Sequence, residues 1–98
     1  MSRVERSSAL FFKVENLAYK YLEKIFQKNT LSDLDMPYDF ESLQFHTESI
    51  LQEVNKYYFQ TIFICKLDIF QKETKQLGYY KLILDMDYQF LDEFFCHC

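Results

Sequence analysis

The sequence predicts an α+β fold, in which two N-terminal helices pack on a small antiparallel C-terminal β-meander. Two observations predict it: apolar residues recur at helical spacing in the N-terminal half and alternate with polar ones in the C-terminal half. An all-α bundle is the alternative, because a chain with one Gly and one Pro is poor in turn residues. The alternation over 63–69 and 80–86 favours the α+β fold, since a helix there would lack a continuous apolar face.

The first expected element is an amphipathic helix over residues 8–28. Ser7 and Ser8 are suitable N-caps, and Lys28 followed by Asn29 suits a helix C-terminus. Lysines and glutamates fill one side of this segment. The apolar positions on the other side are Leu10, Phe11, Val14, Leu17, Ala18, Tyr21, Leu22, Ile25 and Phe26.

A loop and a second helix are expected next. Residues 29–39 lack periodicity and contain the only Pro, so they are interpreted as a loop. Asp39 is a good N-cap, and Glu41 lies where the helix dipole favours negative charge. The apolar spacing that follows, from Phe40 to Val54, predicts a helix over 40–56.

The remaining chain is interpreted as strands. Residues 60–71 are rich in aromatic and β-branched residues and alternate at 65–69, which predicts a strand. The polar stretch 71–76, closed by Gly78, predicts a turn, and the alternation over 80–86 predicts a second strand. Residues 85–89 indicate a tight turn, and 90–95 either a short third strand or a terminal turn of helix.

Length and composition indicate one soluble domain over residues 1–98. Apolar residues make up 49% of the chain, yet no run reaches the roughly 18 that a membrane span needs. The short apolar run after the N-terminus does not fit a signal peptide, and three cysteines suit reduced thiols, so a cytoplasmic protein is expected. Because 11 Phe and 8 Tyr exceed what a small core hides, some rings should line an interface, and a homodimer is possible.

No catalytic apparatus, cofactor or metal is expected. Cys96, His97 and Cys98 form one ligand group at the chain end, to which only His46 or Cys65 could be added. No signature places a cysteine beside a histidine, and a single Gly cannot form a phosphate-binding loop. Paired carboxylates such as those at 85 and 87 are interpreted as solvated turn residues.

The charge distribution favours a basic protein partner. Residues 1–31 hold six Lys or Arg against three Glu, whereas residues 32–98 hold five Lys against twelve Asp or Glu. This acidic part disfavours direct nucleic-acid binding. Carboxylates interleaved with rings indicate either a solvated surface or a partner-binding face. The candidate residues of that face are Asp33, Asp35, Asp39, Glu41, Asp85, Asp87, Tyr88, Asp92 and Glu93.

Residues 78–95, GYYKLILDMDYQFLDEFF, resemble the C-terminal part of small acidic immunity proteins from bacterial polymorphic toxin systems of the contact-dependent inhibition type. Many of these proteins end in an aromatic strand, an acidic turn and an apolar–acidic–aromatic segment. The resemblance implies a protein that binds a cognate toxin domain, often a basic nuclease, and occludes its active site. Two alternatives stay open: a phage- or plasmid-encoded inhibitor of a host nucleic-acid machine, and a homodimeric structural or adaptor protein.

Overall fold

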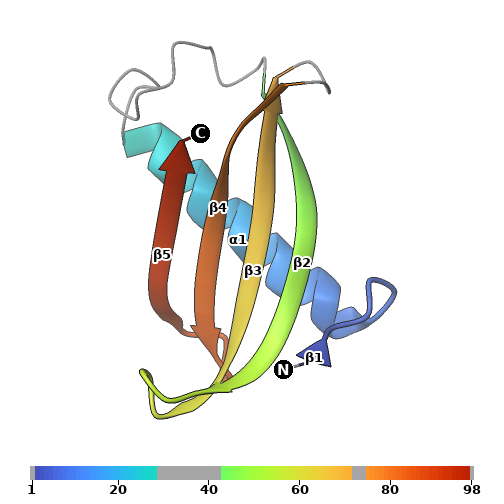
Figure 1. Ribbon diagram of the computed structural model, residues 1–98, viewed down its shortest axis with the longest axis vertical. Coiled ribbons are helices and arrows are strands. Elements are labelled where there is room, and N and C mark those ends of the chain that lie inside the picture. Colours follow the sequence, from blue (N-terminus) through green and yellow to red (C-terminus); the bar gives the residue numbers. More distant parts are fainter. Residues whose placement is uncertain (1, 29–42, 72–74, 98) are drawn as a thin grey trace.

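A long helix lies across one face of a five-stranded antiparallel sheet (Figure 1). The computed structural model describes residues 2–28, 43–71 and 75–97. In chain order the elements are β1 (Ser2–Arg3), α1 (Ala9–Lys28), β2 (Leu43–Asn55), β3 (Gln60–Gln71), β4 (Lys75–Asp85) and β5 (Phe90–His97). The strands keep this order in the sheet, so β2 to β5 form a meander. The α+β class is confirmed, and the all-α alternative is wrong.

The helix predicted over 8–28 is confirmed as α1. Its N-cap is Ser8, whose Oγ accepts a hydrogen bond from the Phe11 N–H at 3.1 Å. Phe11, Val14, Ala18 and Leu22 are all buried, at spacings of three and four residues that place them on one face of the helix. That face packs on β2, β3 and β4.

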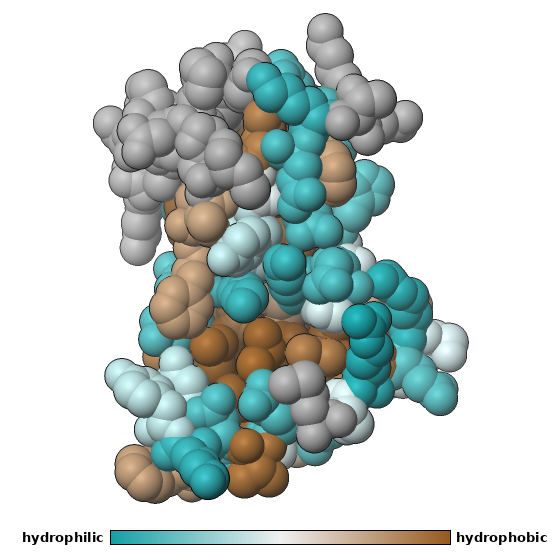
Figure 2. Space-filling model, in the orientation of Figure 1, coloured by the Kyte–Doolittle hydropathy of each residue, from teal (hydrophilic) through white to brown (hydrophobic). Residues whose placement is uncertain are grey.

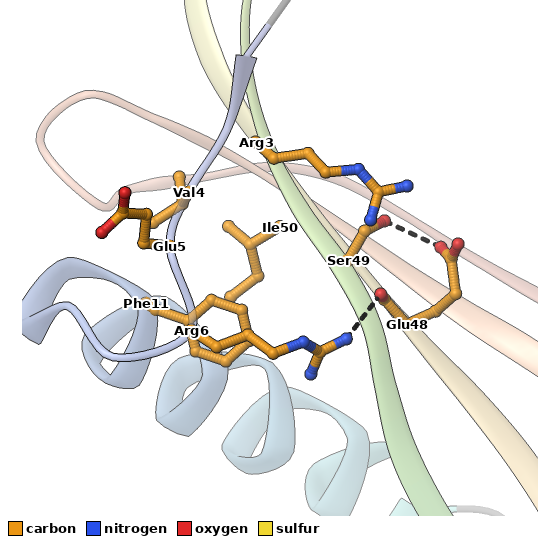
Figure 3. A pocket seen from close by; sticks show the side chains of 8 residues that line it. All are labelled: Arg3, Val4, Glu5, Arg6, Phe11, Glu48, Ser49 and Ile50. Carbon is orange, nitrogen blue, oxygen red and sulfur yellow. Dashed lines mark hydrogen bonds between the residues drawn. The ribbon is translucent and has the colours of Figure 1, made fainter.

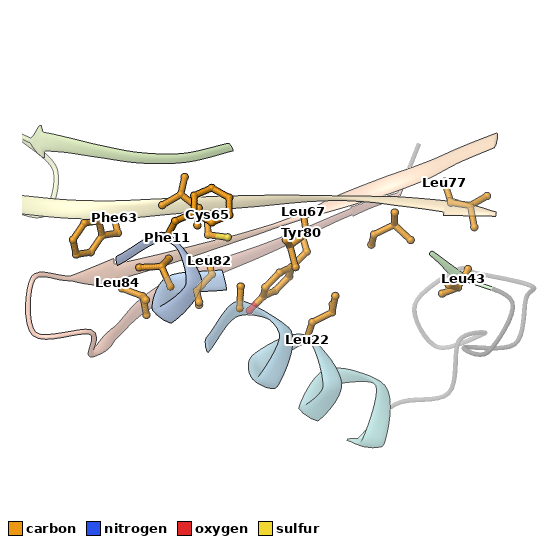
Figure 4. Packing of buried hydrophobic residues seen from close by; sticks show 14 residues of the cluster. Phe11, Leu22, Leu43, Phe63, Cys65, Leu67, Leu77, Tyr80, Leu82 and Leu84 are labelled. Carbon is orange, nitrogen blue, oxygen red and sulfur yellow. The ribbon is translucent and has the colours of Figure 1, made fainter. Parts of the chain in front are cut away.

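The core lies between α1 and the sheet (Figure 4). β3 and β4 are the central strands, and every second residue of β3 points toward α1. Burial of these side chains against the helix supplies the main hydrophobic stabilisation of the fold. The buried residues that the sheet contributes to this cluster are Leu43, Ile50, Phe63, Cys65, Leu67, Ile69, Leu77, Tyr80, Leu82 and Leu84.

The second helix, predicted over 40–56, is wrong: Leu43–Asn55 forms strand β2, and residues 40–42 lie outside the described residues. The cause is a β-bulge between Thr47 and Ser49. The bulge adds one residue, so Leu43 and Ile50 lie seven apart yet face the same side of the sheet. A spacing of seven also equals about two helical turns, which is why the pattern resembled a helix.

The C-terminal half matches the prediction more closely. The strand expected over 60–71 is confirmed as β3. The strand expected over 80–86 belongs to β4 up to Asp85, and Met86 already lies in the following turn. The turn predicted over 71–76 is wrong at both ends, because Gln71 belongs to β3 and Lys75 and Gln76 belong to β4. Residues 72–74 are not described. Residues 90–95 belong to strand β5 and not to a helix. The loop predicted over 29–39 lies outside the described residues.

The N-terminal segment is fastened to the bulge in β2. The Val4 N–H donates to the carbonyl of Ile50 at 2.9 Å. The Arg6 guanidinium donates to the carbonyls of Thr47 and Glu48 at 3.0 and 2.9 Å. A bulge disrupts the regular ladder, and Arg6 supplies donors to the carbonyls at this point. A cavity of about 210 Å³ beside these residues (Figure 3) is therefore part of the attachment of the N-terminus.

Candidate protein-binding surface at the hairpin end

Two hairpin loops lie at the same end of the sheet (Figure 1). Residues 56–59 join β2 to β3, and residues 86–89 join β4 to β5. Because successive strands of a meander run in opposite directions, alternate loops fall at one end. We call the surface formed by residues 53–60 and 84–92 the hairpin end.

The first loop displays aromatic rings. The Asn55 Oδ1 accepts hydrogen bonds from the N–H groups of Tyr57 and Tyr58 at 2.8 and 3.4 Å, which forms an Asx turn. Phe59 closes the loop with a φ of 57°. The side chain of Tyr57 is 81% exposed and that of Phe59 is 93% exposed. Two large rings therefore stand in solvent on a short, hydrogen-bonded loop.

The second loop is built around the carboxylate of Asp85. Its Oδ1 accepts hydrogen bonds from the N–H groups of Asp87 and Gln89 at 2.8 and 2.9 Å. The backbone closes the turn with two further bonds, from Tyr88 N–H to Asp85 O and from Asp85 N–H to Gln89 O. The bond between Asp85 and Gln89 encloses three residues, 86–88, and Tyr88, the last of them, has a φ of 63°, as is common at this position. This arrangement leaves the Asp87 carboxylate exposed at the tip.

Phe59 and Tyr88 use their positive φ differently. For an L-residue other than Gly, the left-handed region costs about 1–2 kcal/mol. The Tyr88 ring offsets this cost, because it stacks on Phe63 at a centroid distance of 5.9 Å and has the Lys13 Nζ 4.1 Å from its centroid. The Phe59 ring is turned into solvent, so no burial of the ring offsets the cost of its positive φ.

A side-chain hydrogen bond joins the two hairpins. The Tyr58 hydroxyl donates to the Asp92 Oδ2 at 3.1 Å and so reaches from the β2–β3 loop to β5. Burial of the phenol, and then this bond, raise the pKa of Tyr58 above its ordinary value. A weaker contact, 3.8 Å long, links Gln52 Nε2 to the sulfur of Met86. The loops are therefore held together as one surface.

The hairpin end carries more negative than positive charge. Over residues 53–60 and 84–92, four carboxylates, Glu53, Asp85, Asp87 and Asp92, stand against one lysine, Lys56. The structure thus places exposed rings next to carboxylates, the combination that anchors and orients one protein on another.

The residues proposed from sequence as a binding face fall into three groups. Asp33, Asp35, Asp39 and Glu41 lie outside the described residues. Asp85, Asp87, Tyr88 and Asp92 belong to the hairpin end, with only the Asp87 carboxylate free of a role within the turn or between the hairpins. Glu93 points to the face of the sheet that α1 covers, where it accepts a 2.7 Å hydrogen bond from the Tyr80 hydroxyl.

Sequence reasoning missed Tyr57 and Phe59. A signal was present, because Asn55 precedes three successive aromatic residues, and Asn favours turns that bond its own side chain to the backbone. In the helix predicted over 40–56, Asn55 lay near the end and its role in a hairpin was hidden.

Among the described residues, the thiols of Cys65 and Cys96 and the imidazole of His46 do not converge. Cys65 lies in the core, where burial, followed by the negative charge of Glu15, raises the pKa of its thiol to about 12. His46 and Cys96 share a cross-strand row on the opposite face, but three strand spacings, about 14 Å, separate them. Within 2–28, 43–71 and 75–97, no three His, Cys, Asp or Glu side chains are grouped to hold a metal ion.

Comparison with protein-family models, curated protein sequences and solved structures finds no significant match to this chain. Among the residues that the structure describes, no helix has the length and apolar character needed to cross a membrane.

Proposed function

We propose that this chain is a non-catalytic immunity protein, which binds a basic toxin domain of the nuclease class through the hairpin end and blocks its active site. Three features support the proposal: the exposed rings at 57 and 59, the carboxylates beside them, and the resemblance of residues 78–95 to small acidic immunity proteins. That segment covers most of β4, the loop 86–89 and β5 up to Phe95.

The observation that carries the proposal is the exposure of Phe59. Stability alone would favour Gly or Asn at a φ of 57°, because both tolerate the left-handed region. A phenylalanine there costs free energy in its backbone and again by leaving its ring in water. Burial of such a ring in a partner contributes about 1.5–3 kcal/mol, which is the size of a binding hot spot.

The carboxylates suit a partner that binds nucleic acid. A nuclease must present positive charge to the phosphates of its substrate. The exposed Asp87, with Glu53 and Asp92 behind it, would compete for the same charge and accelerate association. Rings at 57 and 59 would then fill the apolar part of the cleft.

The chemistry of the described residues supports a binding protein. Its strongly shifted groups, the Cys65 thiol and the Tyr80 hydroxyl, belong to the core under α1. An acid–base or nucleophilic site needs such groups in a cleft that substrate can reach.

The proposal is tested by co-expression with the toxin gene adjacent to the gene of this chain. The wild-type chain should restore growth and form a one-to-one complex with the purified toxin domain. Phe59→Ala should weaken that complex by about 30-fold or more, as loss of a hot spot of 2 kcal/mol does. Phe12→Ala is the matched control, because Phe12 is an exposed ring on α1 and is not one of the residues of the hairpin end. Equal binding by both variants would refute the site.

A charge reversal tests the electrostatic part separately. Asp87→Lys should slow association and flatten its dependence on salt, whereas Glu23→Lys, the same change on the exposed side of α1, should leave both unchanged. Asp85 and Glu93 are unsuitable for this test, because reversal there would disrupt the turn and the bond to Tyr80. If the neighbouring gene product neither arrests growth nor binds the chain, the proposed function is wrong.

A further inference from the structure

The face of the sheet opposite α1 is apolar at its centre. Leu51, Ile64 and Ile83 form one cross-strand row over β2, β3 and β4, because the register pairs Leu51 with Ile64 and Ile64 with Ile83. On the edge strand β5 the row ends at Asp92, which pairs with Ile83 and accepts the hydrogen bond from Tyr58. Phe94 of β5, 48% exposed, lies in the neighbouring row. Figure 2 shows this apolar area with hydrophilic side chains around it. No described helix or strand covers it (Figure 4).

A shallow hollow lies on this face. Its volume is about 250 Å³, and its lining is Ile64, Tyr79, Lys81, Ile83 and Phe94. A hollow lined by two β-branched side chains and two rings can take side chains from a second apolar surface. The face is therefore apolar, and its shape also allows a second surface to pack against it.

The charges flanking the apolar row are arranged with opposite signs on its two sides. On one side the adjacent row holds Lys66 and Lys81, which pair with each other across β3 and β4. On the side of the hairpin end the adjacent row holds Glu53 and Asp85, both paired with Ile62. The two ammonium groups lie over the Tyr79 ring, 4.8 and 5.6 Å from its centroid, and so lean away from the apolar row.

We propose that this face binds a second copy of the chain, around a two-fold axis that runs along the apolar row and across the strands. Rotation about this axis reverses the strand direction, so β3 lies over β3 of the second copy. The apolar residues of the row meet their own copies at the centre, and Asp92 faces its copy at the solvent-facing edge of the sheet. Lys66 and Lys81 then lie over the row that holds the partner's Glu53 and the partner's Asp85. Symmetry repeats these contacts, which is the self-complementarity that a two-fold interface requires.

The geometry of packed sheets permits these pairs. Aligned sheets pack about 10 Å apart and cross at about 30°. For a side chain that lies two residues away from the axis, this crossing gives a sideways displacement of about 3 Å, which is less than one strand spacing. Each lysine therefore stays within reach of a carboxylate. The other face-to-face arrangement, with the axis along the strands, would oppose lysine to lysine and is disfavoured.

This dimer leaves the tip of the proposed toxin-binding surface accessible, with the exposed side chains of Tyr57, Phe59 and Asp87, whereas Glu53 and Asp85 belong to the dimer interface. Because strand direction is reversed, the two hairpin ends lie at opposite ends of the assembly. The inference does not depend on the proposed function, and either can fail without the other.

Sedimentation equilibrium of the full chain at micromolar concentration tests the dimer. The wild-type chain should sediment as a dimer. Ile64→Glu should raise the dimer dissociation constant at least about tenfold, because it buries an unpaired charge twice per interface. Lys20→Glu, on the exposed side of α1, also adds negative charge and should leave the dimer intact. A wild-type monomer, or an Ile64→Glu dimer as strong as that of Lys20→Glu, would overturn the proposal.

A charge swap tests the orientation without touching the core. Lys66→Glu and Glu53→Lys should each weaken the dimer, because each opposes like charges across the interface. The double variant Lys66→Glu/Glu53→Lys should recover the wild-type dissociation constant within about threefold, as a compensated pair does. A double variant weaker than both single variants would overturn the proposed axis, and this result stands even if Ile64→Glu fails to fold.

Discussion

The hydroxyl of Tyr80 donates a 2.7 Å hydrogen bond to the carboxylate of Glu93 on the face of the sheet that α1 covers. The register makes them diagonal neighbours, since Tyr80 pairs with Phe95 and Leu82 pairs with Glu93. Burial, followed by this bond, raises the pKa of Tyr80 well above its ordinary value. The carboxylate is thus held within the fold, which explains why Glu93 lies apart from the other acidic residues of the C-terminal segment.

This pair should show energetic coupling. Tyr80→Phe leaves a partly buried carboxylate without its donor and should lower the free energy of unfolding by about 1–3 kcal/mol. The double variant Tyr80→Phe/Glu93→Gln should lose less than the sum of the single variants, with a coupling of about 0.5–3 kcal/mol. Urea denaturation measures all four chains. Tyr57→Phe, which removes an exposed hydroxyl, should change stability by less than about 0.5 kcal/mol. Additive losses would show that the two side chains do not interact.

Stability should fall in alkaline solution because of the core thiol. The pKa of Cys65 is about 12 in the folded chain against 9.0 for a free thiol, so the folded state holds a proton that the unfolded state releases. The stabilisation is complete below about pH 9 and is lost as pH rises toward 12, at about 1.4 kcal/mol per pH unit. Urea unfolding at successive pH values should show a shallower decline for Cys65→Ala than for the wild-type chain. Parallel declines would contradict the assignment.

The Ser8 cap should contribute to the stability of α1. Ser8→Ala removes the acceptor of the Phe11 N–H and should lower the free energy of unfolding by about 1 kcal/mol. Ser7→Ala, one residue earlier and exposed, is the control and should change stability by less than about 0.5 kcal/mol. Thermal unfolding followed by circular dichroism distinguishes them. Equal effects would mean that the helix begins elsewhere.

Replacing Phe59 should separate stability from binding. Phe59→Gly relieves the positive φ and should raise the free energy of unfolding by up to about 1 kcal/mol, while it removes the proposed anchor. The same substitution at exposed Phe12 places Gly inside a helix and should lower stability by about 0.5–1 kcal/mol. Chemical denaturation of both variants shows whether each substitution raises or lowers the free energy of unfolding. A destabilised Phe59→Gly would show that the ring supports the loop.

Much of the fold follows from local pattern. α1 has a regular helical period with Ser8 before it, and β3 is rich in β-branched and aromatic residues and alternates over 65–69, so both were predictable. β2 was not, because its bulge near residue 48 gives Leu43 and Ile50 the spacing of a helix. β1 consists of two residues paired with Leu51 and Gln52, and no local signal specifies such a distant partner.

The candidate site was only partly predictable for a related reason. Asp87 follows from the turn pattern alone, because acidic residues beside a tight turn are usually solvated. Asp92 and Glu93 are neighbours on one strand, so they must point to opposite faces, and only the position of α1 decides which one is covered. The exposure of Phe59 can be predicted only if residues 56–59 are known to form a hairpin loop. That requires residues 43–55 to be recognised as a strand.

The order of the elements along the chain has a consequence for synthesis. α1 is made first, but the strands that cover Phe11, Val14, Ala18 and Leu22 come later, and β4 is complete only at Asp85. At about 5–20 residues per second, a ribosome exposes this apolar helix for several seconds before its cover emerges. Nascent chains that stop before β4 would therefore be targets for chaperones and proteases, whereas the finished chain can close over its own helix.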